Sequence, residues 1–571
     1  MRFLIFLSVL VSGLSVAAAL RSSAGLQAQT ADRPLILPMA SDPGLNTWLF
    51  GQPYGNTVTA YNTGSRQYSA GQGLHFGLDF SMPCGTPLVA VADGVVTAVD
   101  NMAFGSAPHN LIIQHPALNY SSLYGHLLEP APVSVGQQVK QGEVVAYSGD
   151  PDDTCVNRPH LHYELRSMDY STTYNPIPVM DAEWHSLGIV GGFNYPLFQI
   201  DLYNARRWVS LDEQPNVVFG GAVLNGYALA DTYPPNGSLR PGANPPLRPN
   251  VTPFDADTPW RTRVIGLPGC CPLQWWDVQN ADRLWVLDGE DGWRAQVFEW
   301  SADLGQIVQP GVDAPLAYTS PDGMRTVSME GDNAVIRTIS DGTTVTVATG
   351  GVMPNVSTDN SKLVWSVSQP STQSVPGARP RVTVYVASIE DGAQASAILT
   401  AEGASALWLD ADRLLLSLPG ERPRTTLAVY DTRDGSQFAL GTFVGLRNLT
   451  ISPDGARVMF YTPYQENPDD SAIYVLETQS GAVPQKLDWF GGWRWRDAES
   501  VYYIPFQWQD AVQTLHYYNV VTGEDVQLTT PEAAPFGVMN AEWSVSADGQ
   551  RIIFRNVLSR QMTLLEAVSG E

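Results

Sequence analysis

The segments HFGLD at residues 75–79 and PHLHYE at residues 159–164 are the two stretches around which the sequence is organised. Side chains at alternate positions of a β-strand share one face. The first segment therefore aligns a histidine with an aspartate, and the second aligns two histidines with a glutamate. Two imidazoles and one carboxylate with an open fourth position suit Zn²⁺. Together the segments predict a metal site formed between two strands.

Short apolar runs surround both segments. Glycine, aspartate and proline separate these runs, which lie at residues 76–80, 87–92, 94–99, 110–114 and 143–147. Runs of this length with such punctuation predict β-strands joined by tight turns. We expect a compact antiparallel β domain over residues 61–180.

A second pattern recurs in the C-terminal half of the chain. Ser-Pro-Asp-Gly at 320–323 and 452–455, and Ser-Ala-Asp-Gly at 546–549, each precede a β-rich run. Weaker copies extend the series, so that the marker aspartate recurs at Asp282, Asp322, Asp359, Asp412, Asp454, Asp497 and Asp548. A period of about 40–50 residues with four short strands predicts β-propeller blades. In four of the units a glycine follows the third strand, where a tight hairpin requires positive φ.

These repeats resemble the TolB-like and WD-repeat-like propellers over roughly residues 262–571, and the resemblance implies about seven blades. An unrelated β-sandwich with coincident turns is the alternative. The fold class is therefore predicted as all-β, with a compact antiparallel β domain followed by a C-terminal β-propeller. Between them we expect an extension packed on the first domain at 181–232 and a proline-rich linker at 233–261.

Length, composition and charge agree with this organisation. A chain of 571 residues is too long for one hydrophobic core. Its 16 Trp, 23 Tyr, 50 Gly and 42 Pro favour strands and turns over helices. The net charge of −25 argues against nucleic acid and anionic membranes as partners, because both require basic patches.

The N-terminal residues 1–19 have the features of a secretory signal peptide. A basic start and a short apolar run lead to an Ala-Ala-Ala cleavage site, and Arg21 ends the apolar stretch. The run is shorter than the roughly 20 residues that span a bilayer. We therefore expect a secreted protein with no membrane span after cleavage, in which residues 20–60 form a lead-in to the first domain.

Four cysteines are present, at positions 84, 155, 270 and 271. Export brings the chain into oxidising conditions, so that Cys84 and Cys155 could pair near the rim of the metal site. Two buried thiols are the alternative. Adjacent Cys270 and Cys271 cannot form an ordinary disulfide with each other, and their state stays open.

Histidines are concentrated around the predicted site, since six of the eight lie within residues 75–162. Their motifs are H-x-x-x-D at 75–79, Tyr-Gly-His at 124–126 and H-x-H at 160–162. In this order the motifs resemble those of the lysostaphin-type (LytM-like) zinc metallopeptidases, which cut the peptide part of bacterial cell-wall peptidoglycan. The resemblance covers about residues 73–176.

The resemblance implies a role for each motif residue. The single Zn²⁺ would be bound by His75, Asp79 and His162. His126 and His160 would be catalytic, flanking the water or the oxyanion. Tyr124 and Glu164 would lie in the shell around the ligands, where packing is an equally good account of both. Latent members of this family cap the zinc with an N-terminal residue, which residues 30–60 could supply.

We therefore expect a secreted zinc metalloendopeptidase that acts on peptidoglycan or related peptides, with the propeller binding a protein or wall ligand. The alternative is a non-catalytic surface-binding or hydrolase-activating protein with a structural metal site. The bond that is cut and the propeller ligand are not encoded in any spacing that we can interpret.

Overall fold

The computed structural model describes most of the chain between residues 33 and 568. The described ranges are 33–57, 59–60, 72–156, 158–190, 197, 199–202, 208–221, 247–248, 250–265, 274–276, 278–279, 282–287, 295–301, 306–313, 318–369 and 379–568. The predicted signal peptide and the Cys270-Cys271 pair lie outside these ranges. Within them, no helix has the length and apolar character needed to cross a membrane.

The N-terminal domain is built on a nine-stranded antiparallel sheet with the order β1-β2-β9-β6-β5-β4-β7, to which β10 and β13 are added beside β9. β3 and β8 form a separate pair, and β11 pairs with β12. The strands are β1 (Leu49–Gln52), β2 (Leu78–Ser81), β3 (Pro87–Val89), β4 (Gly94–Val99), β5 (Leu111–His115), β6 (Tyr120–Gly125), β7 (Gln138–Val139), β8 (Val144–Tyr147), β9 (His160–Arg166), β10 (Thr172–Tyr174), β11 (Gln199–Ile200), β12 (Trp208–Val209) and β13 (Val217–Val218).

The helices within the described residues are short. A 3-10 turn η2 (Met102–Phe104) follows β4, the one-turn helix α3 (Trp184–Leu187) follows β10, and a second 3-10 turn η5 (Pro468–Asp470) lies in the C-terminal part. The described structure is thus nearly all β, as the sequence predicts.

The C-terminal part consists of seven four-stranded antiparallel sheets, which are the predicted propeller blades. Blade 1 has β15 (Gln274–Trp276), β16 (Arg283–Leu287), β17 (Ala295–Ser301) and β18 (Gln306–Asp313); blade 2 has β19 (Tyr318–Thr319), β20 (Arg325–Glu330), β21 (Asn333–Thr338) and β22 (Thr344–Ala348); blade 3 has β23 (Asn355–Val356), β24 (Lys362–Gln369), β25 (Arg381–Ser388) and β26 (Ser396–Glu402); blade 4 has β27 (Ser405–Trp408), β28 (Arg413–Pro419), β29 (Arg424–Asp431) and β30 (Gln437–Val444). Blade 5 has β31 (Arg447–Ile451), β32 (Arg457–Thr462), β33 (Ala472–Glu477) and β34 (Gln485–Lys486); blade 6 has β35 (Gly491–Trp495), β36 (Ser500–Pro505), β37 (His516–Asn519) and β38 (Asp525–Gln527); blade 7 has β39 (Val538–Val545), β40 (Arg551–Asn556), β41 (Met562–Ala567) and, from the start of the propeller, β14 (Trp260–Val264).

Each marker aspartate lies in the turn between the first and second strands of one blade. In blade 5, Ser452 donates its hydroxyl to Asp454 Oδ1 at 2.6 Å, and the same oxygen accepts the amide of Ala456 at 3.0 Å. Such a side chain closes the turn by replacing a backbone acceptor. Five of the markers accept an amide in this way, and each of the seven markers corresponds to one blade. In blade 4 the acceptor is Asp410, two residues before the marker Asp412.

The blades are bonded to one another around a ring. Arg413 of blade 4 donates to the carbonyl of Thr478 in blade 5, and Arg457 of blade 5 donates to the carbonyl of Ala498 in blade 6. Blade 7 meets blade 1 through the ion pair of Arg551 and Asp282. β14 pairs with β41, so the first strand of the propeller completes its last blade and joins the two ends of the ring.

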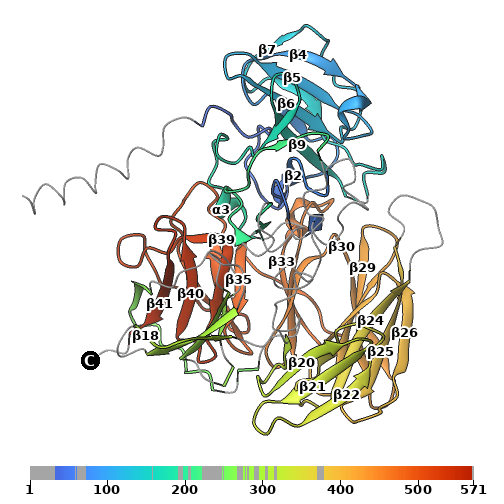
Figure 1. Ribbon diagram of the computed structural model, residues 1–571, viewed down its shortest axis with the longest axis vertical. Helices are drawn as coiled ribbons and strands as arrows, with labels where there is room; N and C mark the ends of the chain where they lie inside the picture. The colour runs from blue at the N-terminus through green and yellow to red at the C-terminus, as the bar shows by residue number, and fades with distance from the viewer. Residues whose placement is uncertain are drawn as a thin grey trace, which may run out of the picture.

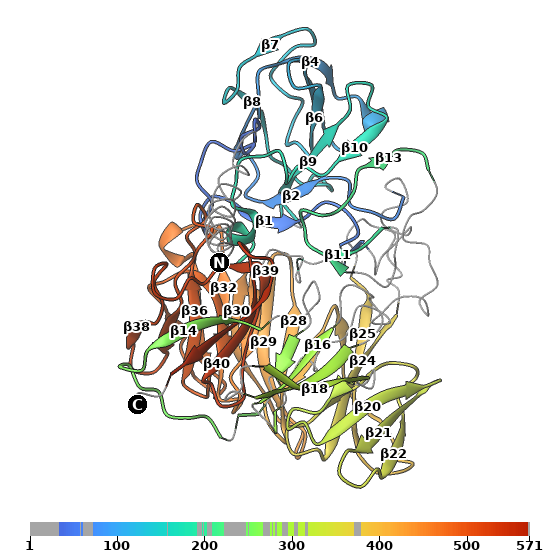
Figure 2. The ribbon, with the colours of Figure 1, turned by 60° about the vertical axis from the view of Figure 1, so that its left-hand side comes forward.

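The N-terminal domain sits on one face of the propeller (Figures 1 and 2). Ser186 of α3 donates its hydroxyl to the carbonyl of Asp510 at 2.6 Å. A Cβ at Gly492 would lie 2.3 Å from the carbonyl oxygen of Ile189, so only glycine allows this close approach. One continuous hydrophobic core joins residues of the first domain, such as Phe80 and Trp184, with residues of blades 5 to 7. The two parts are therefore packed together through an apolar contact.

Candidate functional site

Four of the predicted site residues, Asp79, His160, His162 and Glu164, lie on two neighbouring strands. β2 and β9 pair antiparallel, and Asp79 lies directly opposite His162. Side chains opposite each other in such a pair lie close together on one face. His75 precedes β2 and is fixed by two backbone hydrogen bonds with Gly55. The register of β2 and β9 thus brings the two segments together.

Three donor atoms converge at this point. His75 Nε2 lies 3.0 Å from Asp79 Oδ1 and 3.1 Å from His162 Nδ1, and the last two atoms are 2.9 Å apart. All three side chains are buried, and together they form a group able to hold a metal ion. Two imidazole nitrogens and one carboxylate oxygen match the donor set of a three-ligand zinc site.

Further hydrogen bonds orient the two imidazoles. His75 Nδ1 lies 2.8 Å from the carbonyl oxygen of Pro53, so this nitrogen is the donor and Nε2 faces the cluster. His162 Nε2 lies 3.0 Å from Glu164 Oε1, which leaves Nδ1 facing the cluster. Arg166 Nε in turn donates to Glu164 Oε2 at 2.7 Å. Carboxylates and carbonyls in such positions fix the ring orientation of metal-binding histidines.

His126 and His160 lie beside the cluster. Their ring centroids are 4.9 Å apart, and His160 Nε2 is 3.7 Å from Asp79 Oδ1. The Nδ1 atoms bond to the carbonyls of Ala107 and Arg158, which directs the Nε2 side of each ring inward. The structure thus brings together all five histidine and aspartate residues of the motifs.

The backbone conformation at Gly125 and His126 explains why the Tyr-Gly-His motif contains a glycine before the histidine. A Cβ at Gly125 would lie 2.4 Å from Cβ of Ser106, so a larger residue would collide with that loop. His126 follows with φ of 56°, a left-handed conformation that histidine adopts more readily than most residues. The close approach of this loop to the end of β6 positions the His126 ring.

Burial and neighbouring charges set the protonation of the residues in the cluster. Burial alone would raise the pKa of the Asp79 carboxyl, but the imidazoles of His75 and His160 and hydrogen bonds from the ligands hold it well below its usual value. Burial opposes protonation of His162, yet its hydrogen bonds to Asp79 and Glu164 raise its pKa to about 9. Without a metal, His162 is therefore protonated at neutral pH between two carboxylates.

The pKa values of His126 and His160 are lowered, whereas that of His162 is raised. Burial and then repulsion by His160 and His162 hold the pKa of His126 well below 6.5. Burial likewise lowers the pKa of His160, although Asp79 opposes the shift. Both imidazoles are neutral at neutral pH and can accept a proton.

Tyr124 is placed away from the ligands. Its hydroxyl donates to the carbonyl of Val89 at 2.9 Å and accepts the amide of Val91 at 3.0 Å. Its buried ring packs edge to face against Tyr163. The structure gives Tyr124 a role in joining β6 to the chain after β3.

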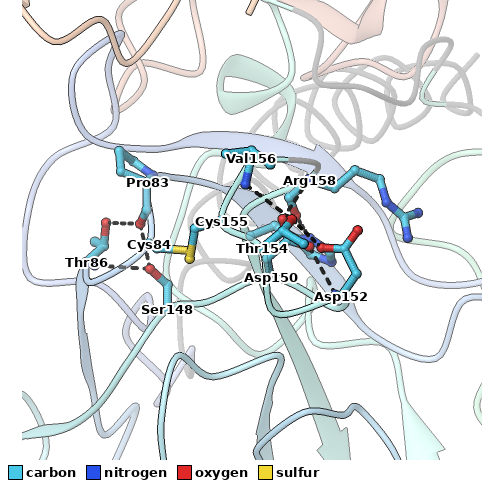
Figure 3. Close-up of a disulfide and its surroundings, with 11 residues drawn as sticks. Pro83, Cys84, Thr86, Ser148, Asp150, Asp152, Thr154, Cys155, Val156 and Arg158 are labelled. Atoms are coloured by element: carbon cyan, nitrogen blue, oxygen red, sulfur yellow. Dashed lines mark hydrogen bonds between the residues drawn. A yellow bond between two sulfur atoms is a disulfide. The ribbon is translucent and has the colours of Figure 1, made fainter. Parts of the chain in front are cut away.

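Cys84 and Cys155 are joined by a disulfide at the rim of the site (Figure 3). It links the loop after β2 to the loop before β9, the two strands that carry Asp79 and His162. Beside it, Arg158 donates its backbone amide to Asp150 Oδ2 at 3.0 Å. Closing a loop of this length stabilises a fold by about 4 kcal/mol in the chain-entropy model. The disulfide therefore holds the loop after β2 against the loop before β9.

The cluster lies in a large cleft between the two parts of the molecule. The cleft has a volume of about 1740 Å³, and the residues of the N-terminal domain in its wall include Gln52 and Thr59. Its other wall belongs to the propeller, with Arg379, Arg422 and Tyr464 among its residues. Small-molecule pockets measure about 300–1,000 Å³. The size of this cleft suits a longer, peptide-like ligand.

Sequence reasoning missed two kinds of site residue. Arg166 continues the alternation of 160, 162 and 164 on β9, so the strand pattern could have found it. The propeller arginines lie more than 200 residues from the metal-binding motifs and carry no local signal. Only the docking of the two parts brings them to the cleft.

Residues 73–176 match the model of Peptidase family M23. An uncharacterized metalloprotease of Haemophilus influenzae is 42% identical over 91 residues, which are 16% of this chain and 18% of that protein. Peptidoglycan DD-endopeptidase ShyA of Vibrio cholerae is 41% identical over 91 residues, 16% of this chain and 20% of that protein. Lysostaphin of Staphylococcus simulans is 28% identical over 139 residues, 24% of this chain and 27% of that protein.

The chain spans about a fifth to a quarter of the length of these relatives. The matched part contains the whole cluster of His75, Asp79 and His162 with His126 and His160. Residues 73–176 are therefore similar to peptidase family M23, and the matched stretch is the part of the chain that carries the buried cluster.

Proposed function

We propose that this protein is a secreted, zinc-dependent endopeptidase that hydrolyses peptide bonds in bacterial cell-wall peptidoglycan. The observation that carries the proposal is the buried cluster of His75, Asp79 and His162 with two further imidazoles beside it. The relatives named as a peptidoglycan endopeptidase and as lysostaphin support the substrate class. The propeller would bind or position the wall material.

In this proposal His75, Asp79 and His162 hold one zinc ion. When bound, zinc supplies a positive charge that polarises a carbonyl and acidifies a water molecule. The Glu164 carboxylate holds the Nε2 proton of His162, and the Pro53 carbonyl holds the Nδ1 proton of His75. These contacts keep both imidazoles aimed at one point and limit the reorganisation needed on binding.

His126 and His160 would transfer the proton of the attacking water. Both are neutral at neutral pH because burial disfavours their charged forms. One imidazole accepts the proton of the attacking water, and an imidazolium returns it to the departing amine. General acid-base catalysis of this kind contributes about 10²–10⁴-fold to a rate.

The substitution His126→Ala tests the assignment. Purified wild-type protein should contain one zinc per chain and solubilise peptidoglycan. The variant should retain its zinc, since His126 is not a ligand, and should lose at least about 100-fold in rate. His516→Gln, on blade 6, is the matched control and should leave both properties unchanged.

Two results would overturn the proposal. One is a wild-type protein that binds no zinc and releases nothing from the wall after zinc is added. The other is a His126→Ala variant that cleaves at the wild-type rate, which would leave the cluster as a structural metal site.

A further inference from the structure

The propeller wall of the cleft carries a pair of arginines on neighbouring blades. Arg379 precedes β25 in blade 3, and Arg422 lies in the turn between β28 and β29 in blade 4. Both side chains line the same cleft as the metal cluster, and both are half-buried. Neither belongs to the peptidase domain.

Arg379 is held in place before any ligand arrives. Its Nη1 donates to the carbonyl of Gly420 at 2.6 Å, which ties it to the turn that carries Arg422. Its side chain passes so close to Gly403 that a Cβ there would lie 3.0 Å from Arg379 Cδ. A guanidinium fixed in this way loses little rotamer freedom when it binds an anion.

The charges of the two guanidinium groups are close enough to affect each other. Burial and then the neighbouring Arg422 lower the pKa of Arg379, while Glu402 opposes the shift. Arginine stays charged in proteins, so the repulsion persists at neutral pH. Glu402 already offsets part of this repulsion, and a carboxylate bound by both groups would lower it further.

The wall is also fixed relative to the cluster. Arg447, at the start of β31, donates Nη2 to the hydroxyl of Ser81 at 2.8 Å and lies over the ring of Tyr464. Tyr464 donates its hydroxyl to the carbonyl of Ser81 at 2.7 Å. Ser81 ends β2, two residues after Asp79. These hydrogen bonds hold the propeller against β2, the strand that carries the predicted metal ligand Asp79.

The charge of the cleft is opposite to that of the whole chain. Its described lining contains five arginines, at 158, 166, 379, 422 and 447, and two carboxylates, Asp79 and Glu164. Both carboxylates are engaged within the metal cluster and its surrounding hydrogen bonds. The net charge of −25 is screened beyond about 8 Å at physiological ionic strength, so it acts weakly on the cleft, whereas the nearby Glu402 offsets part of the charge of Arg379.

We propose that Arg379 and Arg422 form a carboxylate-binding subsite for the peptide that is cleaved, so that the propeller selects substrates in the active-site cleft. Arginine binds carboxylates through two parallel hydrogen bonds, which gives direction as well as affinity. Peptidoglycan stem peptides carry free side-chain and terminal carboxylates. This inference rests on the proposed function and adds a substrate determinant outside the peptidase domain.

An anionic phosphate polymer of the wall could also be attracted by arginines. The geometry favours the peptide, because the arginines line the same cleft as the cluster and are not on a separate face. A carboxylate bound by these arginines would therefore belong to a peptide that also reaches the metal cluster.

The test uses two synthetic peptides that differ only at their carboxylates. One is a crosslinked stem peptide with free carboxylates, and the other is the same peptide with carboxamides. Equilibrium binding is measured by fluorescence anisotropy, and kcat and KM are measured on both peptides with zinc-loaded full-length protein. The double variant Arg379→Gln/Arg422→Gln is compared with the wild type and with Arg433→Gln, an exposed arginine of blade 4 outside the cleft lining.

The wild type should bind the carboxylate peptide about tenfold more tightly than the carboxamide peptide. The double variant should lose that preference, with KM raised about tenfold on the carboxylate peptide and kcat little changed, while Arg433→Gln behaves as the wild type. A melting temperature equal to that of the wild type shows that the variant is folded.

Equal binding of both peptides by the wild type would overturn the proposed subsite but would not bear on the proposed peptidase activity. Retention of the preference in the double variant would also overturn the proposed subsite. Binding preference without cleavage of either peptide would support the subsite and overturn the proposed function. Competition by a glycerol-phosphate polymer at lower concentrations than the carboxylate peptide would assign the arginines to the polymer and overturn the proposal.

Discussion

Glu164 shows how one residue controls the proposed metal site without touching the metal. It accepts a hydrogen bond from His162 and is held by Arg166. Burial would raise its pKa, but Arg166 and His162 lower it to about 2, so the carboxyl is ionised at neutral pH. An ionised acceptor raises the basicity of the imidazole that it orients.

We predict that Glu164→Gln weakens zinc binding by about 10–100-fold, because the neutral amide holds the His162 ring less firmly. Competition with a chelator of known affinity measures the change. Glu129→Gln, an exposed glutamate of the same domain, is the control and should not alter the affinity. Equal zinc affinity in wild type and Glu164→Gln would show that the carboxylate does not orient the ligand.

The raised pKa of His162 predicts a specific pH dependence of zinc binding. A pKa of about 9 means that His162 must release a proton when metal binds at neutral pH. The apparent dissociation constant should therefore fall about tenfold per pH unit from pH 7 to pH 9 and then level off. A histidine with the ordinary pKa of about 6.5 would level off before pH 7. Zinc titrations in chelator buffers distinguish the two, and a flat response above pH 7 would contradict the account.

Among elements, the pairing of β2 with β9 explains why part of the site was predictable. Alternation along each strand places His160, His162 and Glu164 on one face, and the antiparallel register adds Asp79. Alternation acts within one strand, whereas the register pairs Asp79 with His162, 83 positions later, so that pairing was predicted from the motifs and not from a local rule. The orientation of Tyr124 does not follow from them, because its hydroxyl bonds to the backbone on a neighbouring segment.

The short helix α3 joins the peptidase domain to the propeller and contains a pH-sensitive contact. His185 Nδ1 accepts the amide of Asn540 in blade 7 at 3.0 Å. Burial lowers the pKa of His185 to about 4, although Asp212 opposes the shift. The unfolded chain binds this proton below about pH 6.5, and the folded chain binds it only below about pH 4. The free energy of unfolding is therefore not reduced by His185 above pH 6.5, and it decreases as the pH falls toward 4.

We predict that acidification from pH 7 to pH 4.5 destabilises the wild type by roughly 1–3 kcal/mol more than the variant His185→Asn. Asparagine retains an acceptor near the position of Nδ1 but does not titrate. Thermal unfolding of both proteins across this pH range provides the measurement. Parallel loss of stability in the two proteins would remove His185 as the cause.

At the scale of the molecule, the number of blades follows from local turn chemistry. The hydrogen bonds of Ser452 and Asp454 form within one turn, and every blade carries a marker aspartate between its first and second strands. Closure of the ring by β14 and β41 is a pairing over about 300 residues, which no local pattern encodes.

The docking of the two domains is similarly beyond sequence reasoning. It depends on the shape of both surfaces and on single contacts such as Gly492 against Ile189 and Tyr464 against Ser81. Through this docking the N-terminal domain forms one wall of a cleft, and the propeller forms the other wall with Arg379, Arg422 and Arg447. The substrate preference that we propose is therefore a property of the whole molecule.

Mass analysis of fragments released from purified peptidoglycan by the zinc-loaded full-length protein distinguishes peptide hydrolysis from other reactions at the wall. We predict soluble fragments whose masses show hydrolysis of one kind of peptide bond, with glycan strands intact and no release by His126→Ala. Fragments produced by glycan cleavage, or the same peptide fragments from wild type and His126→Ala, would contradict this prediction.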